Sequence, residues 1–548
     1  MKLIECVPNF SEGRDRAVID AIAAEIAATS GAMLLDVDPG AATNRTVVTF
    51  IGGPDAVEEA AFRAIKKAAA SIDMTRHRGE HQRLGATDVC PFVPVAGATM
   101  EDCVAIARRL GKRVGEELGI PVYLYEAAAT RPERRSLADI RKGEYEALVE
   151  KLKDPAFAPD FGPTRFNARS GATVIGAREF LIAYNINLNT REKKLANAIA
   201  QALREAGKSK RSPDGTTTSV PGRFKECRAV GWYIEEFGRA QVSINLTNYK
   251  VTSLHAVFDA ACEEAAKLGL RVTGSELVGL IPREALLAAG DHYLAKQGKT
   301  TGIPEKERVH TAVLSLGLSE LAAFDARRKV IEYRYADGPP GLVGMTIRDF
   351  ADELSSSSPA PGGGSVAALC GALSASLVAM VAALTWSKAG MEAARPAMES
   401  VGTEAQTLKD WFLGAIDRDT EAWNAVLAGM RLPKKTEEEI AARASAVESA
   451  SQGAAKVPLD VLEAAIRALE LSLQAVNDGN PSSVSDAGAA GAAALAAAEG
   501  ASLNVRINSG LLTDRSVADE YLARQAGALA RARDLAEKVG RAVDAVLG

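Results

Sequence analysis

The segment 336–344, ADGPPGLVG, marks the point at which the pattern of the 548-residue chain changes. Its prolines and glycines are typical of a linker, because proline cannot continue a helix and glycine weakens helices and strands. Before it, short apolar runs alternate with amphipathic helical windows, whereas residues 345–548 are rich in Ala, Leu and Glu with helical periodicity. The sequence therefore predicts an α/β region, a linker over residues 326–344 and an all-α region.

The α/β region contains two series of predicted elements. The first series has a helix at Pro54–Ile72 and strands at Leu3–Val7, Met33–Val37, Thr46–Ile51, Val89–Val95 and Val122–Tyr125. The second has helices near Arg191–Glu205, at Ser253–Leu268 and from Arg283, and strands at Phe180–Leu188, Ala229–Ile234, Ala240–Leu246 and from Leu270. Both can be read as strand, helix, strand, strand, helix, strand, which is typical of ferredoxin-like α/β sandwich subdomains. We expect these subdomains at residues 1–179 and 180–325, with residues 208–222 as a surface loop.

The all-α region is predicted to be a helical-bundle domain over residues 345–548. Helices are expected to start after Gly364, near Arg395, at residues 433–437, near Val457, at Ser485 and near Thr513. Residues 365–387, SVAALCGALSASLVAMVAALTWS, carry no charge over a length that could span a bilayer. Their small side chains have weak membrane affinity and let helices pack closely, which favours a buried helix over a membrane span.

Composition limits the class of function. The formal net charge of -5 argues against general nucleic-acid binding. The six cysteines are scattered, without a CxxC pair or the spacing of a disulfide frame or zinc site, which favours a reducing compartment. The amino terminus, MKLIECVPN, lacks the apolar core of a signal peptide. We expect a cytoplasmic protein without a metal site.

The polar stretch Met74 to Asp88, MTRHRGEHQRLGATD, holds two of the five histidines, His77 and His81. Histidine can exchange a proton near neutral pH, and neighbouring arginines such as Arg83 can hold carboxylates. Two alternatives remain: a solvated charged loop, and a zinc site built on the H-x-x-x-H spacing. The zinc site is disfavoured, because the two glycines of this stretch disrupt a regular helix.

Two further loops have the composition of an anion site. They are Val7 to Arg14, VPNFSEGR, and Asp36 to Arg45, DVDPGAATNR, and each follows a predicted strand. Their candidate substrate-binding residues are Asn9, Asp38 and Asn44. The alternative is that these side chains only cap the backbone of turns.

Two features of the carboxyl-terminal region can carry chemistry. Gly362, Gly363 and Gly364 stop at a predicted helix start, where free backbone N–H groups can receive an anion or a carbonyl oxygen; the alternative is a flexible hinge. Asp419 shares a helix face with the apolar Ile416 and Trp423, so burial is expected to raise its pKa, although an exposed helical acid fits the pattern equally well.

Long motifs of the chain resemble the formimidoyltransferase-cyclodeaminase family. Residues 1–335 resemble the transferase half of the family, through the motifs VPNFSEGR, DVDPGAATNRTVVTF, DMTRHRGEHQRLGATDVCPFVPV, FLIAYNINL and GWYIEEFGRAQVSINLTNY. Residues 345–548 resemble the cyclodeaminase half, through APGGGSVAA, IDRDTEAW and NDGNPSSVSD. A bacterial methenyltetrahydrofolate cyclohydrolase shares the second fold.

The resemblance implies specific site residues. His81 is implied as the catalytic acid/base of the transferase, and Asp419 as the catalytic aspartate of the cyclodeaminase. The family's folate-binding loop corresponds here to Gly162, Pro163, Thr164, Arg165, Phe166, Asn167, Ala168, Arg169, Ser170 and Gly171. In this loop the glycines match more securely than the side chains.

The resemblance also implies the reactions. The formimino group of N-formimino-L-glutamate moves to tetrahydrofolate, with or without a polyglutamate tail, and 5-formiminotetrahydrofolate then closes to 5,10-methenyltetrahydrofolate with release of ammonia. A homo-oligomer built from dimers is implied. The alternatives are that the helical half is a methenyltetrahydrofolate cyclohydrolase, or that the chain is a non-catalytic folate-binding scaffold.

Overall fold

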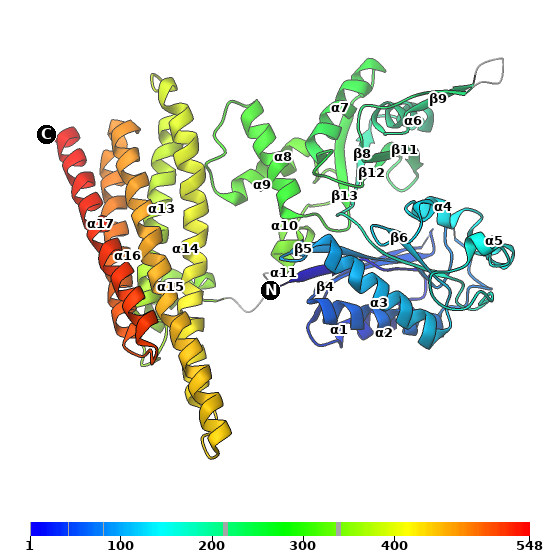
Figure 1. The fold of residues 1–548 in the computed structure, drawn as a ribbon. Helices are drawn as coiled ribbons and strands as arrows, with labels where there is room; N and C mark the ends of the chain where they lie inside the picture. Colours follow the sequence, from blue (N-terminus) through cyan, green and yellow to red (C-terminus); the bar gives the residue numbers. More distant parts are fainter. Residues whose placement is uncertain (1, 42, 80–81, 212–216, 336–340) are drawn as a thin grey trace. The chain divides into compact units, whose positions relative to one another are not determined.

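The computed structural model describes residues 2–41, 43–79, 82–211, 217–335 and 341–548. Its contacts divide the chain into two units: Met1–Ala289 with Leu316–Ala336, and Gly290–Ser315 with Asp337–Gly548. The first unit is mixed α/β and the second is largely helical (Figure 1), which confirms the predicted succession of the two classes. The finer boundaries at residues 179, 325 and 344 stay a prediction.

The first half of the α/β unit is built on a seven-stranded sheet. Its strands are β1 (Leu3–Cys6), β2 (Asn9–Phe10), β3 (Ala32–Gly40), β4 (Arg45–Gly52), β5 (Thr87–Ala96), β6 (Val122–Glu126) and β7 (Thr173–Ala177). Strands β1 and β2 together occupy one interior position of the sheet, because each pairs antiparallel with both β4 and β5. β3 pairs with β4 on one side of the sheet, and on the other β7 and β6 run parallel to β5.

Three helices cover one face of this sheet (Figure 1): α1 (Arg16–Ala27), α2 (Pro54–Ser71) and α3 (Met100–Leu118). α1 begins where the Asp15 side chain accepts from the N–H of Ala17, and α3 begins at a Thr99–Asp102 capping box. The core between helices and sheet contains the fully buried Phe50 of β4 and Phe92 of β5. Two short helices, α4 (Leu137–Arg141) and α5 (Glu144–Lys151), follow β6.

The second half of this unit has a four-stranded antiparallel sheet in the order β11-β12-β8-β13. Its elements are β8 (Ile182–Leu188), α6 (Lys193–Leu203), β11 (Cys227–Ile234), β12 (Arg239–Leu246), α7 (Leu254–Lys267) and β13 (Val272–Val278). The expectation that residues 208–222 form only a surface loop is wrong, since β9 (Lys208–Arg211) and β10 (Thr217–Val220) pair there as a hairpin. After β13 come α8 (Arg283–Lys296), in which the first unit ends at residue 289, and α9 (Glu305–Leu316), which belongs to the helical unit up to residue 315. The chain then returns to the α/β unit with α10 (Ala326–Lys329) and α11 (Ile331–Tyr335), so part of the predicted linker is helical.

The helical unit contains long helices separated by short turns. They are α12 (Ile347–Leu354), α13 (Gly363–Ser387), α14 (Arg395–Met430), α15 (Glu437–Asp478), α16 (Val484–Ser509) and α17 (Arg515–Leu547). Short 3₁₀ turns of this unit lie at Leu342–Gly344, Glu392–Ala394 and Pro481–Ser483, and those of the α/β unit lie at Pro132–Arg134 and Pro155–Phe157. The uncharged helix α13 packs against both α14 and α16.

α13 is the one helix of the described residues that is long and apolar enough to cross a membrane. Its most apolar 18-residue window has a mean hydropathy of 2.2, and 56% of that window is buried inside the protein. The side chains of Ala368, Ala375 and Val378 are fully buried. Such burial is what a core helix of a bundle shows, and it agrees with the expected buried helix.

The predicted helix start near Val457 is wrong. α15 continues through Pro458, which lies inside the helix. Proline removes one backbone hydrogen bond, to the carbonyl four residues earlier, Ala454. That carbonyl accepts from Nδ2 of Asn508 on α16 at 2.8 Å, so the helix continues without leaving it unpaired.

Candidate functional sites

Four segments predicted to form the transferase site lie side by side in the first half. Ser11, directly after β2, donates its hydroxyl to the Gly85 carbonyl at 2.7 Å. Gly79 packs so tightly on the loop between β3 and β4 that a Cβ there would lie 2.2 Å from the Thr43 carbonyl oxygen. Gly85 also forms a β-bridge with Gly171, at the end of the predicted folate loop. The structure therefore brings together residues 7–14, 36–45, 74–88 and 162–171.

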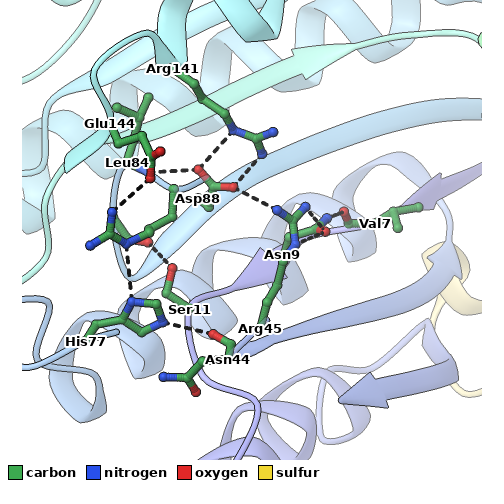
Figure 2. Close-up of polar contacts among 12 residues, drawn as sticks. Val7, Asn9, Ser11, Asn44, Arg45, His77, Leu84, Asp88, Arg141 and Glu144 are labelled. Carbon is green, nitrogen blue, oxygen red and sulfur yellow. Dashed lines mark hydrogen bonds and ion pairs between the residues drawn. The ribbon is translucent and has the colours of Figure 1, made fainter. Parts of the chain in front are cut away.

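Asp88 lies almost fully buried at the centre of a polar cluster (Figure 2). Arg45 Nη1 donates to Oδ2 of Asp88 at 3.2 Å and Arg141 Nε to Oδ1 at 3.3 Å. The backbone N–H of Leu84 donates to Oδ1 at 3.0 Å, and Arg45 Nε donates to Oδ1 of Asn9 at 2.9 Å. Burial lowers the pKa of Arg45 to about 10, although the negative charge of Asp88 acts to raise it. Two guanidinium groups therefore share the carboxylate of Asp88, and guanidinium groups are well suited to bind the carboxylates of a substrate.

His77 is buried in the same cluster and is held at both ring nitrogens (Figure 2). Nε2 lies 2.9 Å from the carbonyl oxygen of Asn44, which can only accept, so Nε2 carries the hydrogen. Arg83 Nε lies 3.3 Å from Nδ1 and can only donate, so Nδ1 accepts. Burial lowers the pKa of His77, consistent with the neutral ring that these contacts require.

Arg83 is held by the protein's own carboxylates. Its Nη1 donates to Glu144 at 2.9 Å, and its Nη2 donates to Glu146 at 2.6 Å. The hydrogen bond that Arg83 donates to Glu146 is the largest cause of its raised pKa. A substrate carboxylate would have to displace one of these partners, so substrate binding by Arg83 stays a prediction.

His81, the predicted catalytic acid/base, lies outside the described residues, but the segments on both sides of it are anchored. On one side, Nδ2 of Asn44 donates to the Arg78 carbonyl at 2.9 Å. On the other, the N–H of Leu84 donates to Asp88. Arg78 is thus connected to the loop after β3, and Leu84 to β5.

The three predicted substrate-binding side chains of the first loops have different surroundings. Asn9 and Asn44 are buried, and Asn44 has a positive φ of 48° and accepts at Oδ1 from the N–H of Gly13. Asn44 thus has at least the backbone-capping role. Asp38 is an exposed residue of β3, although partial desolvation of its carboxyl, with a smaller contribution from Asp36, raises its pKa. Their binding of substrate stays a prediction.

The predicted folate loop, 162–171, has an exposed start and a buried end. Pro163, Thr164 and Arg165 are exposed, whereas Ser170 and Gly171 are buried. Gly162 has a φ of +84°, and a Cβ there would lie 2.4 Å from the Ile120 carbonyl oxygen. Only glycine fits that position without strain.

Within the loop, the central residues bind mainly to the protein. Phe166 packs against the ring of Tyr145 at a centroid distance of 5.4 Å, and Asn167 accepts from the N–H of Ser170. The Ala168 carbonyl accepts from Tyr145, and Arg169 donates to the Ala70 carbonyl at 2.7 Å. Folate contacts of this loop stay a prediction.

Several residues of the cluster were not singled out from the sequence: Arg45, Asp88, Arg141, Glu144 and Glu146. Arg45 and Asp88 stand inside the quoted motifs, where a buried position next to other polar residues was a usable signal. Arg141 and the two glutamates lie in α4 and α5, a charged segment without a distinctive spacing, and only the fold brings them to the site.

The helical unit has a separate site at the start of α13. A Cβ on Gly364 would lie 2.1 Å from Oδ1 of Asp419, so residue 364 must lack a side chain for the carboxyl to fit. Ser365 donates from its hydroxyl to Oδ2 of Asp419 at 3.1 Å and also from its backbone N–H to the carboxyl. Gly362 is the N-cap residue of α13 and Gly363 is its first residue, without a side-chain cap of their own. The carboxyl of Asp419 therefore caps α13 from a neighbouring helix.

Asp419 has the electrostatic surroundings of a proton-exchanging group. Burial raises its pKa, and the two hydrogen bonds from Ser365 oppose that shift. The direction is the one expected from the helix face. Asp417, two residues earlier, accepts instead from the N–H of Leu342 at 2.7 Å, at the end of the linker.

Among the described residues, no group of three or more His, Cys, Asp and Glu side chains is placed to hold a metal ion. His81 is outside that search, so the expected absence of a metal stays a prediction.

The chain thus joins a cluster of buried ionisable groups in an α/β unit to a partly buried carboxyl of raised pKa in a helical unit, an arrangement typical of an enzyme with two separate active sites. A formimidoyltransferase-cyclodeaminase from Mus musculus is 45% identical over 515 residues, which are 94% of this chain and 93% of the relative. The chain belongs to the formimidoyltransferase-cyclodeaminase family.

Further comparisons match either the α/β part or the helical part of the chain. Family models match residues 3–178 (Formiminotransferase domain, N-terminal subdomain), 183–336 (Formiminotransferase domain) and 346–526 (Formiminotransferase-cyclodeaminase). A glutamate formimidoyltransferase from Streptococcus pyogenes is 43% identical over 54% of this chain and 93% of its own. A methenyltetrahydrofolate cyclohydrolase from Methylorubrum extorquens is 39% identical over 35% of this chain and 93% of its own.

Proposed function

We propose that this protein transfers the formimino group from N-formimino-L-glutamate to tetrahydrofolate and then cyclises the product to 5,10-methenyltetrahydrofolate with release of ammonia. The observation that carries the proposal is the match of both halves, in one order, to the bifunctional relative from Mus musculus. The family name states both activities, and we assign one activity to each of the two polar sites described above.

In the first reaction, His81 takes the proton from N5 of tetrahydrofolate as this nitrogen adds to the formimino carbon. It then returns the proton to the departing glutamate nitrogen. Arg45 and Arg141 supply positive charge beside this step, and the substrate carboxylates are attracted to it. The loop 162–171 holds the folate.

In the second reaction, N10 of 5-formiminotetrahydrofolate attacks the formimino carbon, and the bond from this carbon to the amino nitrogen breaks. Asp419 moves the proton to the leaving nitrogen, which departs as ammonia. Its raised pKa supports this role, because a carboxyl that holds its proton more firmly is a better proton donor near neutral pH. Gly362, Gly363 and Gly364 present backbone N–H groups to the substrate. No step uses a metal.

Two substitutions separate the sites. His81→Ala is expected to lower formimidoyl transfer by about 10²- to 10⁴-fold while ammonia release from supplied 5-formiminotetrahydrofolate stays at the parent rate. Asp419→Asn is expected to do the reverse. A His81→Ala protein with the parent transfer rate, or an Asp419→Asn protein with the parent ammonia rate, would show that the assignment is wrong.

A second candidate function concerns the helical half, because one relative that it resembles is named a methenyltetrahydrofolate cyclohydrolase. A cyclohydrolase acts on 5,10-methenyltetrahydrofolate and water and releases no ammonia. Supplying 5-formiminotetrahydrofolate and measuring ammonia distinguishes the two activities. A non-catalytic folate-binding scaffold would bind folate and turn over neither substrate.

The proposal includes the finer architecture. Each α/β half is a ferredoxin-like sandwich, which is supported in the second half by the succession β8, α6, β11, β12, α7, β13 and the antiparallel order β11-β12-β8-β13. In the first half, the corresponding succession ends at β5, and β7 and β6 extend the sheet. Residues 1–179 and 180–325 would carry the transferase and residues 345–548 the cyclodeaminase, in a cytoplasmic homo-oligomer of dimers.

A further inference from the structure

The hydroxyl of Ser365 has more acceptors within reach than it has hydrogens. Its Oγ lies 3.1 Å from Oδ2 of Asp419, 3.1 Å from the carbonyl oxygen of Ile416 and 3.3 Å from the hydroxyl of Thr420. A serine hydroxyl has one hydrogen to donate and two lone pairs that accept. The Ile416 carbonyl and an ionised Asp419 therefore compete for the same hydrogen.

The competition is resolved by the charge of Asp419. When the carboxyl is ionised, the hydroxyl gains most by donating to Oδ2, because a hydrogen bond to a charged acceptor is the stronger one. When Oδ2 carries a proton, that proton can be donated to Oγ, and the Ser365 hydrogen turns to the Ile416 carbonyl. Both protonation states are thus fully hydrogen-bonded without movement of a heavy atom.

Ser365 and Asp419 differ in their exposure. Ser365 is 0% exposed, whereas Asp419 is only partly buried. Gly364 packs directly on Oδ1 of Asp419, where a Cβ would lie 2.1 Å away. The accessible surface of this pair therefore belongs to Asp419, while the serine hydroxyl is shielded from solvent and substrate.

We propose that Ser365 is a positioning residue of the ammonia-releasing site, whose hydroxyl holds Oδ2 of Asp419 in both of its protonation states. The inference rests on the proposed cyclodeaminase function. Holding the carboxyl in one place through a proton transfer removes the reorganisation that would otherwise accompany the reaction.

The effect on Asp419 has a definite sign. Ser365 stabilises the ionised carboxyl, and it opposes the effect of burial on the pKa of Asp419. No charged side chain of the described part of the chain is among the causes of that shift. Removal of the hydroxyl takes away one of the two hydrogen bonds that lower the pKa of Asp419, so this pKa rises further. The limb of the pH–rate profile that reports Asp419 therefore moves to higher pH in Ser365→Ala.

The experiment follows ammonia release from 5-formiminotetrahydrofolate by the full-length protein as a function of pH. Ser365→Ala is expected to lower kcat about tenfold, leave KM within about twofold and shift the Asp419 limb upward, whereas Ser365→Thr, which keeps the hydroxyl, restores the parent limb. The matched control is Ser374→Ala, which removes another fully buried hydroxyl of α13, one for which the described residues provide no hydrogen-bond partner. It is expected to behave as the parent.

The outcomes are distinguishable. A Ser365→Ala protein that matches Ser374→Ala in rate and pH profile overturns the positioning role, and so does a lowered kcat with an unshifted limb, because that result indicates only a structural change. If Ser365→Ala does not fold, the Ser365→Thr protein decides: a parent-like limb supports the role of the hydroxyl, and a limb displaced from the parent overturns it. A parent protein that releases no ammonia overturns the proposed function itself and, with it, the role of Ser365.

Discussion

At the scale of single residues, Glu5 in β1 is a carboxyl that the fold buries, with only 2% of the residue exposed. Burial raises its pKa from 4.5 to about 8, although the positive charge of Arg178 acts in the opposite direction. The folded pKa lies above the unfolded one, so the stability contributed by neutral Glu5 is complete below pH 4.5 and is lost as the pH rises toward 8.

This shift predicts a pH-dependent stability. At about 1.4 kcal/mol for each tenfold change in proton affinity, the loss is on the order of 4 kcal/mol. We expect the Tm of the parent to fall relative to that of Glu5→Gln between pH 5 and pH 8, because glutamine stays neutral. The control is Glu101→Gln, an exposed carboxyl of α3, whose Tm difference from the parent should not change in this way. A pH-independent difference for Glu5→Gln would contradict the assigned burial cost.

Asp419 shows how far the sequence leads at this scale. Its position on one helix face with Ile416 predicted a buried carboxyl with a raised pKa; the structure shows a partly buried residue whose pKa is raised. Its partner Ser365 is 54 positions away in the sequence, and no local pattern indicates that contact. The same limit explains why the pairing of Arg141 with Asp88, 53 positions apart, was not predicted.

At the scale of elements, the start of α13 depends on its glycines. Gly364→Ala places a Cβ 2.1 Å from Oδ1 of Asp419, so the carboxyl must move. A displacement of about 1 Å can cost about 10²-fold in rate, and we expect a loss of ammonia release of that order with formimidoyl transfer unchanged. The matched control is Gly540→Ala on α17, where a Cβ meets nothing within 4 Å. Parent-like ammonia release by Gly364→Ala would mean that Asp419 does not need its observed place.

The contact between α15 and α16 gives a second prediction at this scale. The buried Ala454 carbonyl receives no backbone hydrogen bond from Pro458, because proline has no N–H. Asn508→Ala removes the side-chain donor that replaces it and leaves this carbonyl unpaired. We expect a loss of about 1–2 kcal/mol in the free energy of unfolding, measured by urea and the helical circular dichroism signal. In a Pro458→Ala background, a restored backbone N–H can take over, so the same substitution should cost less. Equal costs in both backgrounds would refute the compensation.

Elements with a strong local pattern were predictable and the others were not. The apolar runs of β4 and the amphipathic α2 agree closely with the predicted ranges 46–51 and 54–72. The two-residue β2 is too short to leave a pattern. Pro458 was a misleading signal for a helix boundary, because the partner that compensates it is Asn508, on another helix.

At the scale of the whole molecule, the chain passes from one unit to the other more than once. Residues 290–315 precede the linker in the sequence, yet they belong to the helical unit. In that unit, Glu399 of α14 accepts from the hydroxyls of Thr300 and Thr301, each at 2.5 Å. A change in composition predicts only one boundary, near residue 336, so this exchange of a segment could not be read from the sequence.

The central claim is that one chain carries both reactions in succession. The most direct measurement supplies the parent protein with N-formimino-L-glutamate and tetrahydrofolate and follows the absorbance of 5,10-methenyltetrahydrofolate together with ammonia. We predict that glutamate, methenyltetrahydrofolate and ammonia appear in equal amounts. Glutamate formed without ammonia, with 5-formiminotetrahydrofolate accumulating, would contradict the claim for the helical half, and the absence of all three products would contradict it for the whole protein.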